Sequence, residues 1–102
     1  MGAERFDNYQ NGTDAKTAFD TAHEQACWDY GHRGYTGSLA EKHEFEIRNG
    51  ELALTLKEAE AFADKDLNEN DHDKWGPAWA IKVRADDSNQ LVGFLFYGYA
   101  SS

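Results

Sequence analysis

The chain has 102 residues, enough for one domain built around one hydrophobic core. Its 19 Asp and Glu residues outnumber its 10 Lys and Arg residues, and the resulting formal charge of −9 argues against direct binding to nucleic acid or to an anionic membrane. The one cysteine, Cys27, excludes an internal disulfide, and no apolar run reaches the roughly 18 residues that a membrane span needs. We therefore expect a cytoplasmic protein whose partner carries a basic surface.

The first 30 residues predict a strand followed by a helix. Residues 4–10 alternate weakly between polar and apolar side chains, and Asn11-Gly12 predicts a turn. Thr13 is suited to cap a helix over about 14–30. The helix has one apolar stripe of mostly small residues: Ala15, Phe19, Ala22, Ala26 and Tyr30. Trp28 lies opposite this stripe, so either another element covers it or it is an exposed anchor for a partner.

Residues 31–42 form the most unusual segment. Its glycines recur at every third position, and between them stand side chains that bind ligands or do chemistry: His32, Arg33, Tyr35, Thr36, Ser38, Glu41 and Lys42. The spacing matches neither the phosphate-binding P-loop nor the dinucleotide motif. Three interpretations remain open: a binding surface, a small ligand or catalytic site with His32 and Arg33 as working groups, or a scaffold whose Tyr35 packs on the core.

Two alternating runs flank Asn49-Gly50, which is a strong local signal for a β-hairpin. A two-residue turn would pair residues 45–48 with residues 51–54 and place their apolar side chains on one face. Along the first run, Glu44 and Glu46 would then form part of an acidic face that meets the basic partner.

The second half predicts a helix and two strands. Thr55 and Glu58 have the spacing of a capping box before a helix over 56 to about 67, and residues 79–84 alternate like an amphipathic strand. Residues 91–99 are almost wholly apolar, as in a central strand covered on both faces. We predict a single α+β domain over residues 1–102, in β-α-β-β-α-β-β order, with a mostly antiparallel sheet and two helices packed on one face.

No cofactor or metal site is predicted. Residues 66–77 begin like a calcium-binding loop, with acids or amides at its positions 1, 3 and 5. The most diagnostic places differ, because Asp71 replaces the glycine and Pro77 replaces the bidentate glutamate. A solvated acidic segment explains this composition better than a calcium site does.

Three segments carry a resemblance. They are Tyr30-Gly31-His32-Arg33-Gly34-Tyr35-Thr36-Gly37-Ser38-Leu39-Ala40-Glu41-Lys42, Asp73-Lys74-Trp75-Gly76-Pro77-Ala78, and the ending Phe96-Tyr97-Gly98-Tyr99-Ala100-Ser101-Ser102. Together they resemble a group of small, uncharacterised proteins from bacteriophages and actinobacteria, in which Thr-Ile stands for Ser38-Leu39 and Trp for Tyr99. The resemblance implies a phage origin, and with it the cytoplasm of a host cell, but it indicates no particular activity. It also makes the three segments candidates for one shared surface.

Small size, acidity and this resemblance favour a binding protein without enzymatic activity. We expect a phage-encoded inhibitor or accessory factor, such as an anti-CRISPR or another anti-defence protein whose carboxylates imitate DNA phosphates. The alternative is a small ligand-binding domain or enzyme with its site in the 31–42 loop, and a homo-oligomer joined through aromatic surface is a third option. The candidate binding residues are Trp28, His32, Arg33, Tyr35, Thr36, Glu41, Lys42, Glu44 and Glu46.

Overall fold

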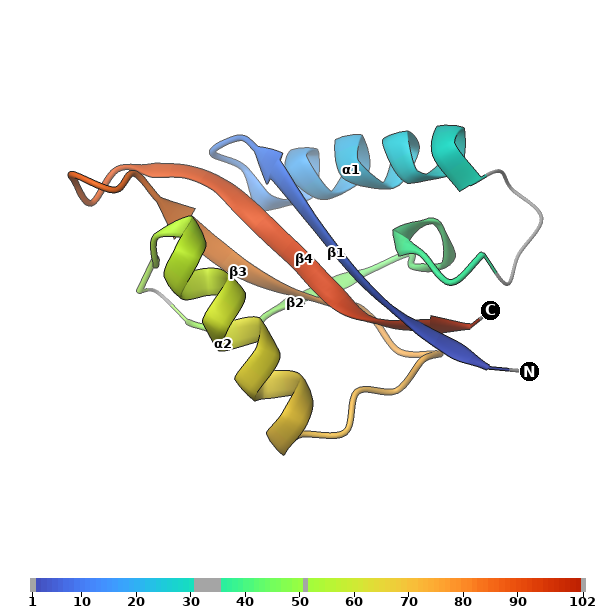
Figure 1. Cartoon of the computed structure of the whole chain (residues 1–102). Helices are drawn as coiled ribbons and strands as arrows, with labels where there is room; N and C mark the ends of the chain where they lie inside the picture. Colours follow the sequence, from blue (N-terminus) through green and yellow to red (C-terminus); the bar gives the residue numbers. More distant parts are fainter. Residues whose placement is uncertain (1, 31–35, 51, 102) are drawn as a thin grey trace.

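The computed structural model describes residues 2–30, 36–50 and 52–101 (Figure 1). Its elements follow in β-α-β-α-β-β order, with a short 3₁₀ turn, η1, after the first helix. Their bounds are β1 Ala3–Asn11, α1 Ala15–Tyr30, η1 Leu39–Glu41, β2 Phe45–Ile47, α2 Leu56–Glu69, β3 Ala78–Arg84 and β4 Leu91–Ser101.

The strands form one mixed sheet in the order β1-β4-β3-β2. β4 pairs antiparallel with β1 and with β3, whereas β2 pairs parallel with β3. The predicted α+β class is confirmed, and β4 is the central strand covered on both faces that the apolar run 91–99 indicates. The predicted order was wrong, because the described residues between β2 and α2 form no antiparallel strand.

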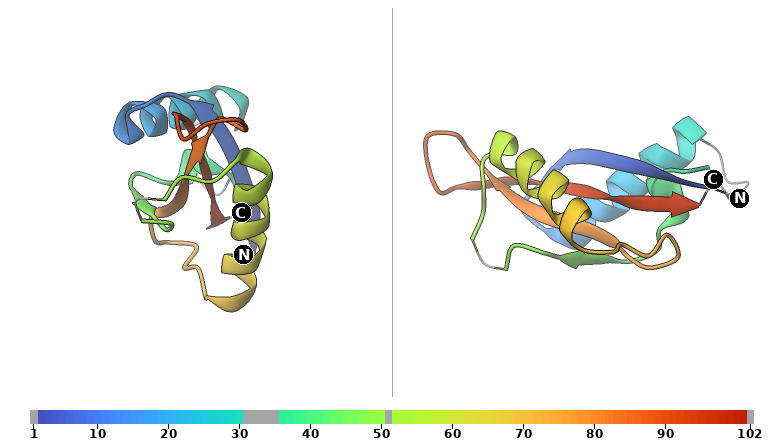
Figure 2. Two further views of the ribbon diagram at one scale, coloured as in Figure 1. Left: turned by 90° about the vertical axis from the view of Figure 1, so that its left-hand side faces the viewer. Right: turned by 60° about the horizontal axis from the view of Figure 1, so that its bottom comes forward.

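The two helices lie on opposite faces of the sheet, and the prediction of one shared face was wrong (Figures 1 and 2). The side chains of β3 alternate, so Ala78 and Ala80 pack with α1 while Trp79 and Ile81 pack with α2. β4 does the same, with Phe96 on the α1 side. A strand that is apolar on both faces needs cover on both, which two helices on one face would not provide.

The chain does not reverse at Asn49-Gly50, so the predicted hairpin was wrong. It continues in the same direction beside β3, where Leu54 makes an isolated parallel bridge with Val83. Between β2 and Leu54, the Asn49 side chain bonds to β3 as a backbone peptide group would. Its Oδ1 accepts from the Lys82 amide at 3.1 Å, and its Nδ2 donates to the Lys82 carbonyl at 3.3 Å. Gly50 does have the positive φ, +61°, that the turn signal required.

The predicted helix starts agree with the structure to within a residue. Asp14, rather than Thr13, caps α1, because its carboxylate accepts from the Thr17 amide at 2.9 Å. Thr55 and Glu58 form the predicted capping box at the start of α2. Across the described ranges, neither helix is long and apolar enough to cross a membrane.

Candidate functional site

An open surface lies between α1 and the β2 edge of the sheet, and we call it the α1–β2 surface. Two hollows here share His43 and Glu44, and a third opens farther along α1, beside Trp28. The His23 ring, which lines the third hollow, lies 5.9 Å from the His43 ring and links the three. The polar and aromatic side chains that line the surface are Lys16, Asp20, His23, Glu24, Trp28, Glu41, His43, Glu44 and Trp75.

Carboxylates dominate the charge of the α1–β2 surface. Asp20 and Glu24 come from one side of α1, and Glu41 and Glu44 from the segment that leads into β2. Lys16 also lines a hollow, and its ammonium group lies 3.1 Å from the Asp20 carboxylate. The surface is therefore net acidic and favours a cationic group from a partner.

Two tryptophans flank these carboxylates. Trp28 is 80% exposed and Trp75 is 61% exposed, whereas Trp79 is buried beneath α2. Tryptophan is costly to leave in water and dominates binding energy at protein interfaces. Of the two sequence-based interpretations of Trp28, the structure supports the exposed one.

His23 is held by two contacts that fix its tautomer. Its Nε2–H donates to the Ala40 carbonyl at 3.2 Å, which leaves Nδ1 to accept from the Cys27 thiol at 3.9 Å. A thiol beside an oriented imidazole is an arrangement that nucleophilic enzymes use. Here the cysteine is buried, with 9% of its area exposed, so the pair is better suited to joining α1 to η1 than to attacking a substrate.

The β2 edge adds backbone groups to this surface. The Glu44 carbonyl accepts from the Ala78 amide, and the Arg48 amide donates to the Ala80 carbonyl, so the even-numbered residues face β3. The N–H and C=O groups of Phe45 and Ile47 therefore face away from the sheet. Within the described part of the chain, β2 is an edge strand and pairs with no second strand on that side.

In the described part of the glycine-rich loop, residues 36–42, polar groups form hydrogen bonds with one another. The Thr36 hydroxyl donates to the Glu41 carboxylate at 2.9 Å, and its amide donates to the same carboxylate at 3.2 Å. Thr36 Oγ1 and Ser38 Oγ are 2.7 Å apart, and Ser38 also caps η1. His32, Arg33 and Tyr35 lie outside the described residues, so their predicted roles stay predictions.

Lys42, predicted as a binding residue, is only 2% exposed. Its ammonium group donates to the carbonyls of Lys74 at 2.7 Å and Gly76 at 2.9 Å. Burial lowers the pKa of Lys42 from 10.5 to about 8, although the carboxylates of Asp73 and Glu41 favour its charged form. Lys42 thus holds the 74–76 segment in place.

The described parts of the three segments that carry the resemblance lie together in the fold. Lys42 links the first to the second, and the Gly37 amide links the first to the third by donating to the Ser101 carbonyl at 2.8 Å. The contacts are backbone hydrogen bonds and one buried ammonium group, so they stabilise this end of the domain.

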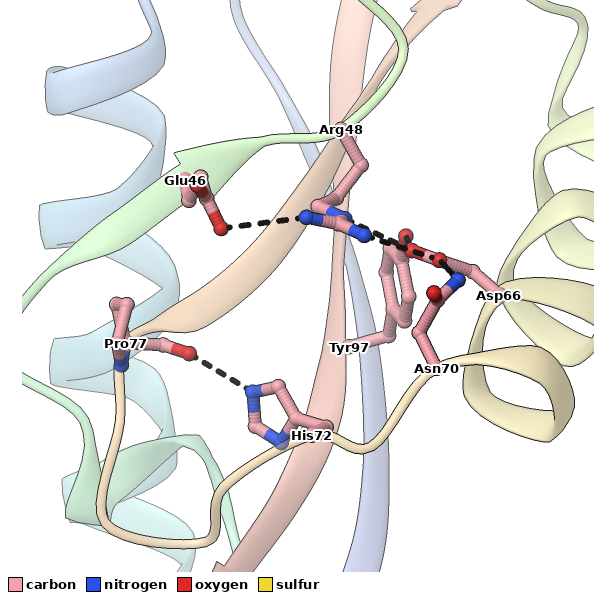
Figure 3. A network of polar contacts seen from close by, with 7 residues as sticks. All are labelled: Glu46, Arg48, Asp66, Asn70, His72, Pro77 and Tyr97. Carbon is pink, nitrogen blue, oxygen red and sulfur yellow. Dashed lines mark hydrogen bonds and ion pairs between the residues drawn. The ribbon is translucent and has the colours of Figure 1, made fainter.

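A second polar cluster lies under α2 and is centred on Asp66 (Figure 3). Arg48 contacts this carboxylate through two nitrogens at 3.0 and 3.2 Å, and Tyr97 and Asn70 each donate to it at 2.7 Å. Burial alone would raise the pKa of Asp66, but the hydrogen bonds from Arg48, Tyr97 and Asn70 outweigh it and hold the pKa below its usual value. The Arg48 guanidinium also stacks over Trp79, 4.0 Å from the ring centroid.

His72 completes the α2 side at the end of β4. Its Nε2–H donates to the Pro77 carbonyl at 2.8 Å (Figure 3). Its Nδ1 accepts from the Tyr99 amide at 2.9 Å, so the ring is neutral. Burial lowers its pKa, in agreement with this assignment. With both ring nitrogens bonded to the backbone, His72 is positioned to hold the 72–77 loop against the sheet.

The structure brings Trp28, Glu41 and Glu44 to one surface and separates them from Glu46. Glu46 is not among the residues that line the three hollows, and its carboxylate is 3.5 Å from the Arg48 guanidinium. The calcium-like segment is used differently from that interpretation, because Asp66, its first position, lies in α2 and binds Arg48. Among the described residues, no group of three His, Cys, Asp or Glu side chains is arranged to hold a metal ion.

Sequence analysis missed six contributors to the α1–β2 surface: Lys16, Asp20, His23, Glu24, His43 and Trp75. A signal for three of them was present, because residues 16, 20 and 24 precede Trp28 at four-residue intervals along one side of a helix. His43 and Trp75 could not be placed, since their proximity depends on how Lys42 fastens the 74–76 segment.

Neither a protein-family model, a curated protein nor a solved structure matches this chain. The chemistry of the α1–β2 surface is therefore the basis for any functional assignment.

Proposed function

We propose that the chain is a binding protein whose α1–β2 surface takes a basic segment of a partner protein. The observation that carries the proposal is the combination of carboxylates with two tryptophans, 80% and 61% exposed, around open hollows. Carboxylates attract and orient Lys and Arg side chains, while exposed tryptophans supply contact area and stack on guanidinium groups. An inhibitor that occupies a basic nucleic-acid-binding surface, or an accessory factor for such a protein, fits this chemistry.

The edge of β2 indicates the form of that segment. The outward backbone groups of Phe45 and Ile47 lie next to the two hollows that share His43 and Glu44. An extended peptide can pair with such an edge while its side chains enter the neighbouring hollows. The preferred ligand is therefore a short, extended, Arg- and Lys-containing stretch rather than a basic helix.

Binding of fluorescent peptides tests this proposal. The probes are extended peptides that alternate Arg or Lys with small apolar residues, and binding is measured by anisotropy at increasing salt. We expect affinity to fall as salt rises, and Trp28→Ala to weaken binding about tenfold or more, as loss of an interface anchor does. Binding that is independent of salt, or unaffected by Trp28→Ala, would contradict the proposal.

A matched pair of charge reversals separates this surface from the general acidity of the chain. Glu24→Lys with Glu44→Lys changes two carboxylates of the α1–β2 surface, whereas Glu60→Lys with Asp87→Lys makes the same charge change at exposed positions elsewhere. Only the first pair should slow association strongly. If both pairs weaken binding equally, net charge explains the interaction and the α1–β2 surface does not. Peptide binding that survives the first pair but is lost in His32→Ala would favour the alternative site in the glycine-rich loop.

A further inference from the structure

β1 presents a long open edge on the other side of the sheet. All nine residues, Ala3 to Asn11, pair with β4 in unbroken register, and no described segment pairs with the opposite side of β1 (Figures 1 and 2). Proteins commonly protect such an edge with proline, a bulge or an excess of one charge. β1 has no proline and no bulge, and its charged residues have both signs.

The hydrogen bonding of β1 fixes which backbone groups face outward. The Gly12 amide donates to the Val92 carbonyl at 2.9 Å, in line with the β1–β4 register. In an antiparallel ladder hydrogen-bonded pairs alternate with non-bonded ones, so the even-numbered residues of β1 bond to β4. The N–H and C=O groups of the odd-numbered residues point away from the sheet: Ala3, Arg5, Asp7, Tyr9 and Asn11.

We propose that β1 pairs antiparallel with β1 of a second copy of this chain, about a twofold axis at Phe6. In this register Arg5 lies opposite Asp7 of the partner subunit, and the symmetry makes the same pair twice. Glu4 lies opposite Asn8 of the partner subunit, so a carboxylate faces an amide donor. The outward backbone groups of the odd-numbered residues then complete a ladder between the subunits.

The charges of β1 select this register over its neighbours. A twofold axis at Asp7 would put two Asp7 carboxylates opposite each other, and an axis at Arg5 would do the same with two guanidinium groups. The Arg5 side chain already lies at this edge between carboxylates, since it forms ion pairs with Asp64 of α2 and, at 3.7 Å, with Asp7. Pairing at Phe6 gives Arg5 a further carboxylate, and it gives Asp7 a second guanidinium.

The helices leave room for this pairing. Both α1 helices lie on one face of the joined sheet, and each packs over both β1 and β4 of its own subunit, because Phe6, Phe94 and Phe96 belong to the α1 core. Two helices placed in this way would be about two strand spacings, roughly 10 Å, apart, which is the distance between helices packed side by side. The α1–β2 surface lies at the far edge of each subunit and stays open, so the dimer would present two binding surfaces.

Cysteine cross-linking tests the register directly. In a Cys27→Ala background, Glu4→Cys with Asn8→Cys places thiols at a non-hydrogen-bonded cross-strand pair, where the close Cα atoms allow a disulfide. The two positions are too far apart along one strand to bridge within a chain. Mild oxidation should give a covalent dimer, with a 4–8 linkage in the peptide map. The control, Glu4→Cys with Gln10→Cys, matches the register centred on Asp7 and should give little 4–10 linkage.

Sedimentation equilibrium tests the charge pairing in solution. Asp7→Arg puts like charges across the axis and should weaken dimerisation at least tenfold, whereas Arg5→Asp with Asp7→Arg restores opposite charges and should recover it to within a few-fold. Melting curves confirm that each variant is folded. The proposal is overturned if the unmodified chain sediments as a monomer up to its solubility limit, if Asp7→Arg dimerises as well as the unmodified chain, or if both cysteine pairs cross-link equally.

Discussion

On the α2 side of the sheet, polar side chains bond one another beneath a helix; on the α1–β2 surface they line open hollows. Asp66, 7% exposed, has three hydrogen-bonding partners, and Lys42 and His72 are bonded to backbone carbonyls or amides. Trp28 and Glu44, by contrast, are exposed. A buried polar group without a partner is costly, so the first set should control stability and the second should be free to act on a partner.

Removing Asp66 should have the largest effect on stability. Asp66→Ala leaves Arg48 and Tyr97 without their shared acceptor, and loss of one partner from a buried ion pair typically costs about 3–5 kcal/mol. Urea denaturation measures the change. Asp64→Ala is the control on the same helix, since its ion pair with Arg5 is exposed and should contribute about 1 kcal/mol or less. Equal losses in the two variants would contradict the distinction between buried and exposed carboxylates.

The same carboxylate should make stability dependent on acid. Because the pKa of Asp66 is lowered in the fold, its stabilising contribution is complete above the unfolded value of about 3.9 and is lost as pH falls through the lower folded value. Denaturation of the unmodified chain and of Asp66→Asn, measured from neutral to acid pH, should therefore converge at low pH. A constant difference between them would show that the charge of Asp66 is not responsible.

Two glycines give the next largest effect. Gly98 has φ +145°, and a Cβ there would lie 2.5 Å from Cε1 of His72, so Gly98→Ala combines backbone strain with overlap and should cost about 1–3 kcal/mol. Gly50 has φ +61° with open space around it, so Gly50→Ala should cost about 1 kcal/mol from strain alone. Thermal unfolding of both variants gives the order, and a greater loss at Gly50 would contradict it.

Local patterns in the sequence predicted local structure well, but they predicted the number, order and connections of the strands poorly. The capping box at Thr55, the central strand β4 and the positive φ of Gly50 depend on a few neighbouring residues, and each is confirmed. The hairpin failed because an Asn side chain can pair with a strand as a peptide group does, and sequence alone does not distinguish this from a turn. The Asp66 cluster joins α2 and β4 with Arg48, which directly follows β2, so no spacing predicted it.

The titration of Lys42 should make the free energy of unfolding depend on pH in the alkaline range. Its folded pKa of about 8 lies below the ordinary 10.5, so between these values the folded chain has released a proton that the unfolded chain still holds. Stability should therefore rise with pH in this window, by at most about 1.4 kcal/mol per pH unit, on top of the other titrations. Lys42→Met should be less stable near neutral pH, because two carbonyls lose their donor, and should lack this rise. A rise of the same size in Lys42→Met would assign it to other groups.

The smallest effect on stability should come from two neighbouring glutamates that have different surroundings. Glu44 lines the α1–β2 surface, whereas Glu46 pairs with Arg48 at 3.5 Å. Glu44→Lys should change the free energy of unfolding by no more than about 0.5 kcal/mol, as surface substitutions usually do, and should slow association of the basic peptides. Glu46→Lys makes the same change in net charge but opposes Arg48, so it should destabilise the fold slightly and leave peptide association nearly unchanged. Stopped-flow association and urea denaturation of both variants measure the two effects. If Glu46→Lys slows association as much as Glu44→Lys does, the charge of this segment as a whole explains the effect, and the assignment of Glu44 to the binding surface is wrong.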